Sequence, residues 1–185
     1  MIGFALCGSF CTVSEALEQL LLLSGKYEVQ GIVSENVFST DTRFGKAEQT
    51  LARIKELTAH PVIHSIPQAE PLGPKTPLEA LVICPCTGNT LAKIAHGITD
   101  TTVTMAAKAH LRCDRPTVIA LASNDSLSQN LSNIATLLLR KRVYFVPLTQ
   151  DDPKSKPHSL VADFSRIPEA LTAALEEKQI RPLFE

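Results

Sequence analysis

The feature that most constrains the fold is a set of short apolar segments separated by stretches with helical spacing. Three of these segments, Ile2–Leu6, Ala80–Cys84 and Thr117–Ala122, show no alternation of apolar and polar residues. Strands with this pattern are covered on both faces, which is typical of a parallel sheet between two layers of helices. The sequence therefore predicts a doubly wound, three-layer α/β/α fold with a Rossmann-like parallel sheet.

The other elements follow from the same periodicities and from turn residues. Thr12 and Glu15 predict a capping box at the first helix, and Gly97 predicts a left-handed helix end. Four prolines and Gly73 between Ile66 and Leu78 predict a helix-free surface loop, and a second exposed loop is expected over Gln150–His158. Further strands are expected at Glu28–Val33 and Val143–Val146, a short extended piece at Pro61–Ile66, and helices at Val13–Leu23, Arg43–Leu57, Asn89–His96, Thr102–Leu111, Leu127–Leu139 and Ile167–Glu177.

Composition narrows the class of protein. With 185 residues, 44% of them hydrophobic, and a net charge of -1, the chain is expected to fold as a single domain over residues 1–185. A disordered chain or a nucleic-acid binder is disfavoured. Glu18 and Gln19 interrupt the most apolar stretch, so no membrane span is expected. Without a basic leader the chain is expected in the cytoplasm.

The five cysteines predict reduced thiols rather than a disulfide framework. Two close pairs, Cys7 with Cys11 and Cys84 with Cys86, raise the alternative of a zinc site. The single residue between Cys84 and Cys86 is fewer than usually separates two zinc-binding cysteines, and no further motif supplies the remaining ligands. Apolar packing is therefore the preferred interpretation, with no metal.

Candidate site residues follow the predicted strands. In a doubly wound sheet, ligands bind outside the carboxyl ends of the strands, where the winding reverses. Gly8-Ser9, Ser34, the segment 85–90 and Ser123-Asn124-Asp125 stand at these places, and all but the last aspartate are uncharged. Each group alone could be an ordinary helix cap, but four at one sheet edge favour a site. The dinucleotide and P-loop fingerprints are absent, so a mononucleotide phosphate is expected.

The block Pro85–Asp100, PCTGNTLAKIAHGITD, resembles the P-A-[ST]-A-N-T motif and the following A-K-x-A-x-G-I-x-D of the FMN-dependent cysteine decarboxylase flavoproteins. The resemblance extends from the first strand to about the last. It implies a flavoprotein fold and bound FMN. The residues that it implies for cofactor binding are Gly8, Ser9, Ser34, Thr87, Gly88, Asn89, Thr90, Ser123 and Asn124.

Within that superfamily the chain is similar to the family of dipicolinate synthase B subunits, through residues 40–45, 71–75, 105–108, 144–153 and 156–162. The resemblance implies one half of an oxidoreductase, active with a dipicolinate synthase A subunit that binds NADPH. Together they would oxidise a dihydrodipicolinate-type precursor to pyridine-2,6-dicarboxylate (dipicolinic acid) during sporulation, in the mother cell of a spore-forming bacterium. It also implies a homo-oligomer, a trimer or a dodecamer.

Departures from the decarboxylase pattern define two alternatives. The decarboxylases keep a histidine just before the motif strand, where this chain has its proline-rich segment, and His64 lies further upstream. Cys86 and Gly88 replace alanines of the motif. A stand-alone FMN-binding decarboxylase or prenyltransferase-like flavoprotein is therefore less favoured. The other alternative is a non-catalytic scaffold for the A subunit.

A planar dicarboxylate calls for arginine forks, lysines or amide donors. Arg43, expected at the start of a helix, is the first candidate, followed by Lys75 and Lys108, with a solvated surface cation as the alternative for each. Asn89 and Asn124 could hold a carboxylate or the flavin edge. Cys86 could lie against the flavin ring. No general acid or base is assigned, and the catalytic residues stay unknown.

Overall fold

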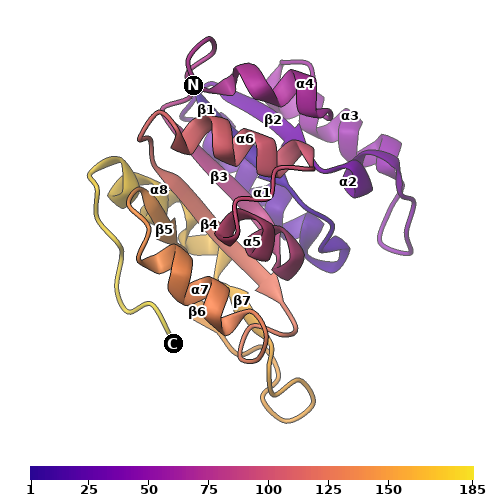
Figure 1. Ribbon diagram of the computed structural model, residues 1–185. Coiled ribbons are helices and arrows are strands. Elements are labelled where there is room, and N and C mark those ends of the chain that lie inside the picture. The colour runs from indigo at the N-terminus through magenta and orange to yellow at the C-terminus, as the bar shows by residue number, and fades with distance from the viewer.

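The computed structural model describes residues 1–185 and contains one seven-stranded sheet flanked by helices (Figure 1). The first five strands run parallel, and the last two pair antiparallel, β7 with β4 and β6 with β7. The strands are β1 (Ile2–Leu6), β2 (Val29–Val33), β3 (Ala80–Thr87), β4 (Thr117–Ser123), β5 (Val143–Phe145), β6 (Leu148–Thr149) and β7 (Leu160–Ala162). The predicted α/β fold with a doubly wound sheet is confirmed.

The winding of the sheet reverses at β1. The strand order is β2-β1-β3-β4-β7-β6, with β5 also paired to β4. Ile2 faces Val29 of β2 on one side and Ala80 of β3 on the other, so β1 is the central strand from which the chain winds both ways. A crevice for a ligand is therefore expected beyond the carboxyl ends of β1 and β3.

Two layers of helices cover the sheet (Figure 1). Helices α4, α6, α5 and α7 pack beside one another on one face, and α3, α1 and α8 do so on the other. The helices are α1 (Val13–Ser24), α2 (Glu35–Ser39), α3 (Ala47–Thr58), α4 (Ile66–Ala69), α5 (Gly88–Ala95), α6 (Thr102–Leu111), α7 (Leu131–Leu138) and α8 (Ile167–Leu175), with 3-10 turns at Phe10–Thr12, Glu70–Leu72 and Phe164–Arg166. None of them has the length and apolar character that crossing a membrane would need.

The core is one cluster of 46 buried residues that begins at Ile2 and ends at Leu183. All of β1 is buried, as is β3 up to Cys86. Gly31 of β2 shows how closely the layers approach, because a Cβ atom there would overlap the side chain of Ile54 on α3. The apolar strands of the sequence are thus the two-sided strands of a sandwiched sheet.

Two expectations about helix starts are wrong, the Thr12 cap of the first helix and the helix start at Arg43, although α1 begins at Val13 as expected. Thr12 makes no side-chain cap with the first helix; its hydroxyl instead donates to the Ser9 carbonyl at 3.0 Å, within the 3-10 turn that precedes α1. Arg43 does not begin a helix. It lies in a tight turn closed by Thr42 and Gly45, and α3 begins only at Ala47, whose N–H donates to the Asp41 carboxylate at 2.9 Å.

The proline-rich segment is not free of helix. It contains α4 and a 3-10 turn, because Pro67 and Pro71 occupy first-turn positions, where the missing N–H costs nothing. Predicted helix Leu127–Leu139 begins late, at Leu131, after turns around Asp125. The short strands β6 and β7 were not predicted, and the exposed loop 150–158 connects them. Gly97 does adopt the expected left-handed conformation, with φ 71°.

Candidate functional site

A cavity of about 700 Å³ opens at the carboxyl ends of β1, β3 and β4. Four segments that are distant in the sequence form its walls, and polar side chains prevail over apolar ones. The lining residues are Gly8, Ser9, Cys11 and Thr12 after β1; Thr87, Gly88 and Asn89 at the start of α5; Ala122, Ser123, Asn124 and Asp125 at the end of β4; and Asp151, Lys156, Ser159 and Val161 around β7. This size and lining suit a small organic molecule.

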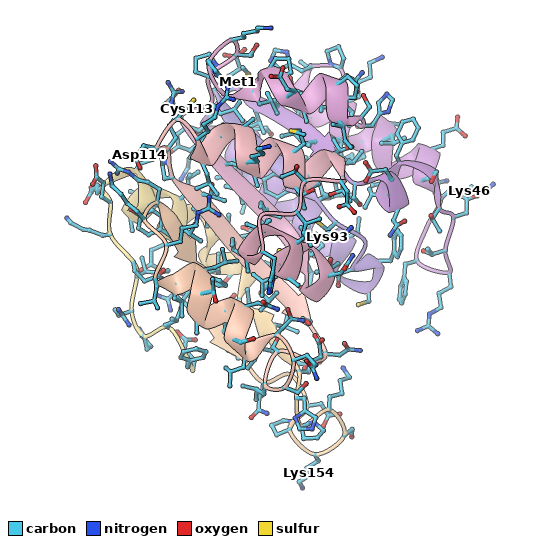
Figure 2. The ribbon with its side chains drawn as sticks, in the orientation of Figure 1. Met1, Lys46, Lys93, Cys113, Asp114 and Lys154 are labelled. Atoms are coloured by element: carbon cyan, nitrogen blue, oxygen red, sulfur yellow. The ribbon has the colours of Figure 1, made fainter.

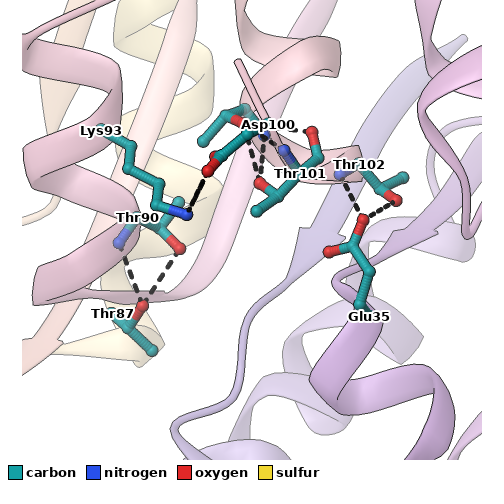
Figure 3. A network of polar contacts seen from close by, with 8 residues as sticks. Glu35, Thr87, Thr90, Lys93, Asp100, Thr101 and Thr102 are labelled. Atoms are coloured by element: carbon teal, nitrogen blue, oxygen red, sulfur yellow. Dashed lines mark hydrogen bonds and ion pairs between the residues drawn. The ribbon is translucent and has the colours of Figure 1, made fainter. Parts of the chain in front are cut away.

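The start of α5 forms one wall. The Thr87 hydroxyl accepts the N–H of Thr90 at 3.3 Å and donates to the Thr90 hydroxyl at 3.0 Å, so Thr87 caps the helix (Figure 3). The first N–H groups of a helix have no acceptor within it, and its dipole makes this end positive. Asn89, in the first turn, is exposed and its side chain makes no hydrogen bond within the chain. This wall therefore offers donors to an anionic or carbonyl-bearing ligand.

The rest of the 85–100 block fixes α5 and α6 relative to each other (Figure 3). Lys93 forms an ion pair with Asp100 at 2.9 Å, and its ammonium group lowers the pKa of that carboxyl. Beyond it, Thr101 caps α6. The Glu35 carboxylate of α2 accepts both the N–H and the hydroxyl of Thr102 at 2.8 Å. These contacts tie the segments after β2 and β3 together.

A hydrogen-bonded network forms the opposite wall. The Asp125 carboxylate accepts from the Ser123 hydroxyl and from the Asn130 side-chain amide, the latter at 2.8 Å. These bonds, first that from Ser123, lower the pKa of Asp125, so its carboxylate is ionised at neutral pH. Gly88 packs directly against the network: an added Cβ would lie 2.5 Å from Ser123 Oγ and 2.6 Å from Asn130 Nδ2. Glycine, in place of the alanine of the resembling motif, makes room for this network.

The loop between β6 and β7 supplies the third wall, which the sequence does not predict. Lys156 is the one basic side chain that lines the cavity, and its ammonium group lies 2.6 Å from the Asp151 carboxylate. The contact lowers the pKa of Asp151 and raises that of Lys156. The loop projects from the body of the protein, with Lys154 at its tip (Figure 2). The charged composition of residues 150–158 was visible in the sequence, but their place beside β4 was not.

Most of the expected cofactor residues meet at this cavity. Gly8, Ser9, Thr87, Gly88, Asn89, Ser123 and Asn124 line it, whereas Ser34 and Thr90 do not. Ser34 stands at the neighbouring strand end: its N–H donates to the Leu6 carbonyl at 2.9 Å, and its hydroxyl accepts from Val37 N–H at 3.4 Å as the cap of α2. Thr90 is buried beneath Thr87.

The three cations expected to bind a dicarboxylate lie elsewhere. Arg43 stacks its guanidinium 4.8 Å above the ring of Phe44, and Lys75 is exposed in the turn before β3. Lys108 of α6 lines a small hollow of about 140 Å³ together with Arg140. The structure gives none of them a contact with the cavity, so their role in substrate binding stays a prediction.

Three of the five cysteines are packing residues, whereas Cys11 is exposed and lines the cavity. Cys7, Cys84 and Cys86 are buried, and burial raises their pKa values, that of Cys7 to about 11. Cys86 does not line the cavity, so its expected place against a flavin ring is not supported. No three His, Cys, Asp or Glu side chains are grouped as a metal site would require.

His64, which lies too far upstream to match the decarboxylase histidine by spacing, also lies outside the cavity. Its ring stacks on Phe38 with centroids 4.0 Å apart. The two rings line a second, more apolar cavity of about 670 Å³ between α2, α3 and the segment before α4. The other lining residues include Leu51 and Val62.

The residues of the polar cavity fit a flavin mononucleotide. Gly8 carries no side chain that would keep a ligand from the backbone after β1, and α5 points its positive end into the space. The free amides of Asn89 and Asn124 can pair with the carbonyl and N–H edge of a flavin. The negative charges of Asp125 and Asp151 require a phosphate to lie away from them, toward Ser9 and Thr87.

Three comparisons with known proteins agree with this geometry. The profile of a family described as Flavoprotein matches residues 1–166. The B subunit of dipicolinate synthase from Bacillus subtilis (strain 168) is 43% identical over 183 residues, which cover 98% of this chain and 92% of the relative. The matches thus include every segment that lines the cavity.

Solved structures show the same fold. The crystal structure of the dipicolinate synthase B subunit from Bacillus halodurans superposes with a TM-score of 0.91 at 43% identity, covering all of this chain and 95% of the other. The FMN-dependent cysteine decarboxylase SpaF superposes with a TM-score of 0.65 at 25% identity, covering 94% of this chain and 95% of the other.

Proposed function

The chain belongs to the flavoprotein family, in the group of dipicolinate synthase B subunits, and from this membership we propose that it takes part in making pyridine-2,6-dicarboxylate. The observation that carries the proposal is the 43% identity across 98% of the chain, together with a polar cavity where a doubly wound sheet binds ligands. In this proposal residues 1–185 are a single domain.

The reaction removes a hydride and a proton from a dihydrodipicolinate-type precursor and so makes the pyridine ring aromatic. FMN, when bound, would supply a hydride acceptor. The oxidant that balances the reaction would be NADP⁺ on the A subunit, which is released as NADPH. The chain would hold the FMN phosphate with Gly8, Ser9 and the N-terminal turn of α5.

The substrate would be oriented by side chains whose hydrogen-bonding groups are free. Asn89 and Asn124 are exposed at the cavity and can each donate an amide N–H to a carboxylate. Lys156, which is ion-paired with Asp151 at 2.6 Å, lines the same cavity. A dicarboxylate would therefore lie between α5 and the β6–β7 loop.

Asp125 is a weak candidate for the proton acceptor. Its pKa is lowered by hydrogen bonds from Ser123 and Asn130, so its carboxylate has little affinity for a proton at neutral pH. Its part in the proposal is to hold Ser123 and the end of β4 in place. The proton acceptor stays unassigned.

The proposed assembly is a homo-oligomer, a trimer or a dodecamer, that works with the A subunit in the cytoplasm of the mother cell during sporulation. The 43% identical relative is named as one subunit of a synthase, which supports a second, different subunit. The absence of His64 from the polar cavity argues against a stand-alone decarboxylase.

Reconstitution with the A subunit tests the proposal. The two proteins are assayed separately and together for pyridine-2,6-dicarboxylate formation. Wild type is compared with Asn89→Ala, Asn124→Ala and the control Gln49→Ala, which removes an exposed amide from α3. We expect product only from the mixture, with at least tenfold less from the two asparagine variants. Product formation at the full rate by the A subunit without this chain would overturn the proposal.

The same assay distinguishes a direct role in the reaction from the alternative of a non-catalytic scaffold. A scaffold would activate the A subunit whether or not Asn89 and Asn124 are present, provided the complex forms. Size-exclusion chromatography of each mixture checks that it does. Full activity of both asparagine variants in an intact complex would therefore favour the scaffold and remove the direct role.

A further inference from the structure

A third cavity, polar and of about 510 Å³, lies at the amino ends of the strands, opposite the candidate site. It opens beside the turn between α7 and β5, where Val143 pairs with Thr117 at the amino end of β4. Its second wall is the C-terminal segment after α8. The proposed function makes no use of this cavity.

The cavity concentrates positive charge. Arg140, Lys141, Arg142 and Arg181 line it, with Glu177 as the one carboxylate among the lining residues. The whole chain has a net charge of -1, so this local excess of positive charge does not follow from composition. It arises because the fold brings residues 138–144 and 177–183 together.

Two of the four cations are already paired within the chain. Arg142 is mostly buried and binds the Glu177 carboxylate at 2.5 Å, and Lys141 binds Asp114, outside the cavity, at 2.5 Å. Arg140 and Arg181 are exposed and form no ion pair. With Asp114 included, the group carries four positive and two negative charges, a net charge of +2. Two guanidinium groups are thus available to a ligand.

The two walls are held firmly together. Gln179 accepts the Phe145 N–H at 2.8 Å and donates to the Phe145 carbonyl at 2.7 Å, so the C-terminal segment is fixed along the edge of β5. In the turn, the Arg142 carbonyl accepts the N–H of Thr117 at 2.8 Å, while Arg142 itself has φ 69°. A long side chain in this uncommon conformation is kept only where its surroundings fix it.

We propose that this cavity binds a phosphate group, as free phosphate or as a phosphate ester. Arg140 and Arg181 would each donate paired N–H groups to its oxygens, the geometry in which guanidinium groups bind phosphate. A phosphate ester carries a charge of about -1.5 to -2 at neutral pH, which matches the net charge of +2, whereas one carboxylate would leave a surplus. Leu138, Leu139 and Leu183 give the cavity an apolar side that an organic ester could cover.

Calorimetric titration of the purified full-length chain with inorganic phosphate and with AMP tests the proposal. The wild-type protein is compared with Arg140→Gln, with Arg140→Gln combined with Arg181→Gln, and with the control Arg53→Gln. Arg53 is a half-exposed arginine of α3 outside the cavity. We expect saturable binding that falls at least tenfold in the double variant, less in the single one, and not in the control.

The two probes distinguish the sources of the phosphate. Tighter binding of AMP assigns the site to phosphate esters, and equal binding assigns it to free phosphate. Hydrogen–deuterium exchange with each probe locates the event, with protection expected in residues 138–144 and 177–183. Absence of saturable binding, an unchanged affinity in the double variant, or protection confined to residues 8–12 and 87–89 would overturn the proposal. Because both arginines are exposed, the variants are expected to keep the wild-type unfolding temperature.

Discussion

Replacing Gly88 by alanine should destabilise the protein, although alanine is the better helix former. Gly88 is the first residue of α5, and a Cβ there would meet Ser123 Oγ at 2.5 Å, Asn130 Nδ2 at 2.6 Å and Asp125 Oδ1 at 2.9 Å. All three atoms belong to the network at the end of β4, so they cannot move away without breaking its hydrogen bonds. The change therefore strains both walls of the cavity.

The magnitude follows from two opposing effects. Overpacking of this kind costs about 1–3 kcal/mol, and the gain in helix propensity offsets up to about 1 kcal/mol. A mid-range overpacking cost of about 2 kcal/mol, less this offset, leaves a net loss of about 1–2 kcal/mol in the free energy of unfolding. For a chain of this length, that loss lowers the midpoint of thermal unfolding by about 2–8 °C.

Gly25→Ala is the matched control for thermal denaturation. Gly25 has φ -73°, and the nearest atom to an added Cβ is the Leu22 carbonyl oxygen at 3.6 Å. The same chemical change should therefore leave the unfolding temperature unchanged or raise it, by up to about 1 kcal/mol of stability. A Gly88→Ala protein as stable as Gly25→Ala would refute the account of this wall.

Three further predictions concern separate contacts. Glu35→Ala removes the acceptor for the Thr102 N–H and hydroxyl, so circular dichroism melts should show about 1 kcal/mol lower stability; an unchanged melt contradicts this. Asn89→Ala should weaken FMN binding about tenfold at an unchanged unfolding temperature, because its amide has no partner in the chain; unaltered affinity counts against the site. Burial lowers the pKa of His110, so stability should fall as the pH drops below about 6.5, and denaturant titrations of His110→Gln should show a shallower dependence.

The sequence was sufficient to predict the centre of the fold. The apolar runs at Ile2–Leu6, Ala80–Cys84 and Thr117–Ala122 are two-sided strands, a pattern that few other structures satisfy. Once the strands were known, the rule for parallel sheets located the carboxyl-end residues. Seven of the nine residues expected to hold a cofactor line one cavity for this reason.

Contacts between distant segments could not be predicted in this way. Strand β6 has two residues and β7 has three, too short for any periodicity, so Lys156 could not be placed in the same cavity as Asp125. The start of α3 depends on Asp41 accepting the N–H of Ala47, six residues later, which no capping pattern anticipates. For this reason Arg43 was expected on a helix and lies in a turn.

Titration of the purified chain with FMN and with riboflavin, followed by quenching of flavin fluorescence, tests the central claim most directly. The claim is that the cavity between the ends of β1, β3 and β4 holds a flavin by its phosphate. It predicts saturation at one FMN per chain, with riboflavin bound at least tenfold more weakly and FMN binding weakened by Asn89→Ala. Equal affinity for the two flavins, or no quenching with either, would contradict it.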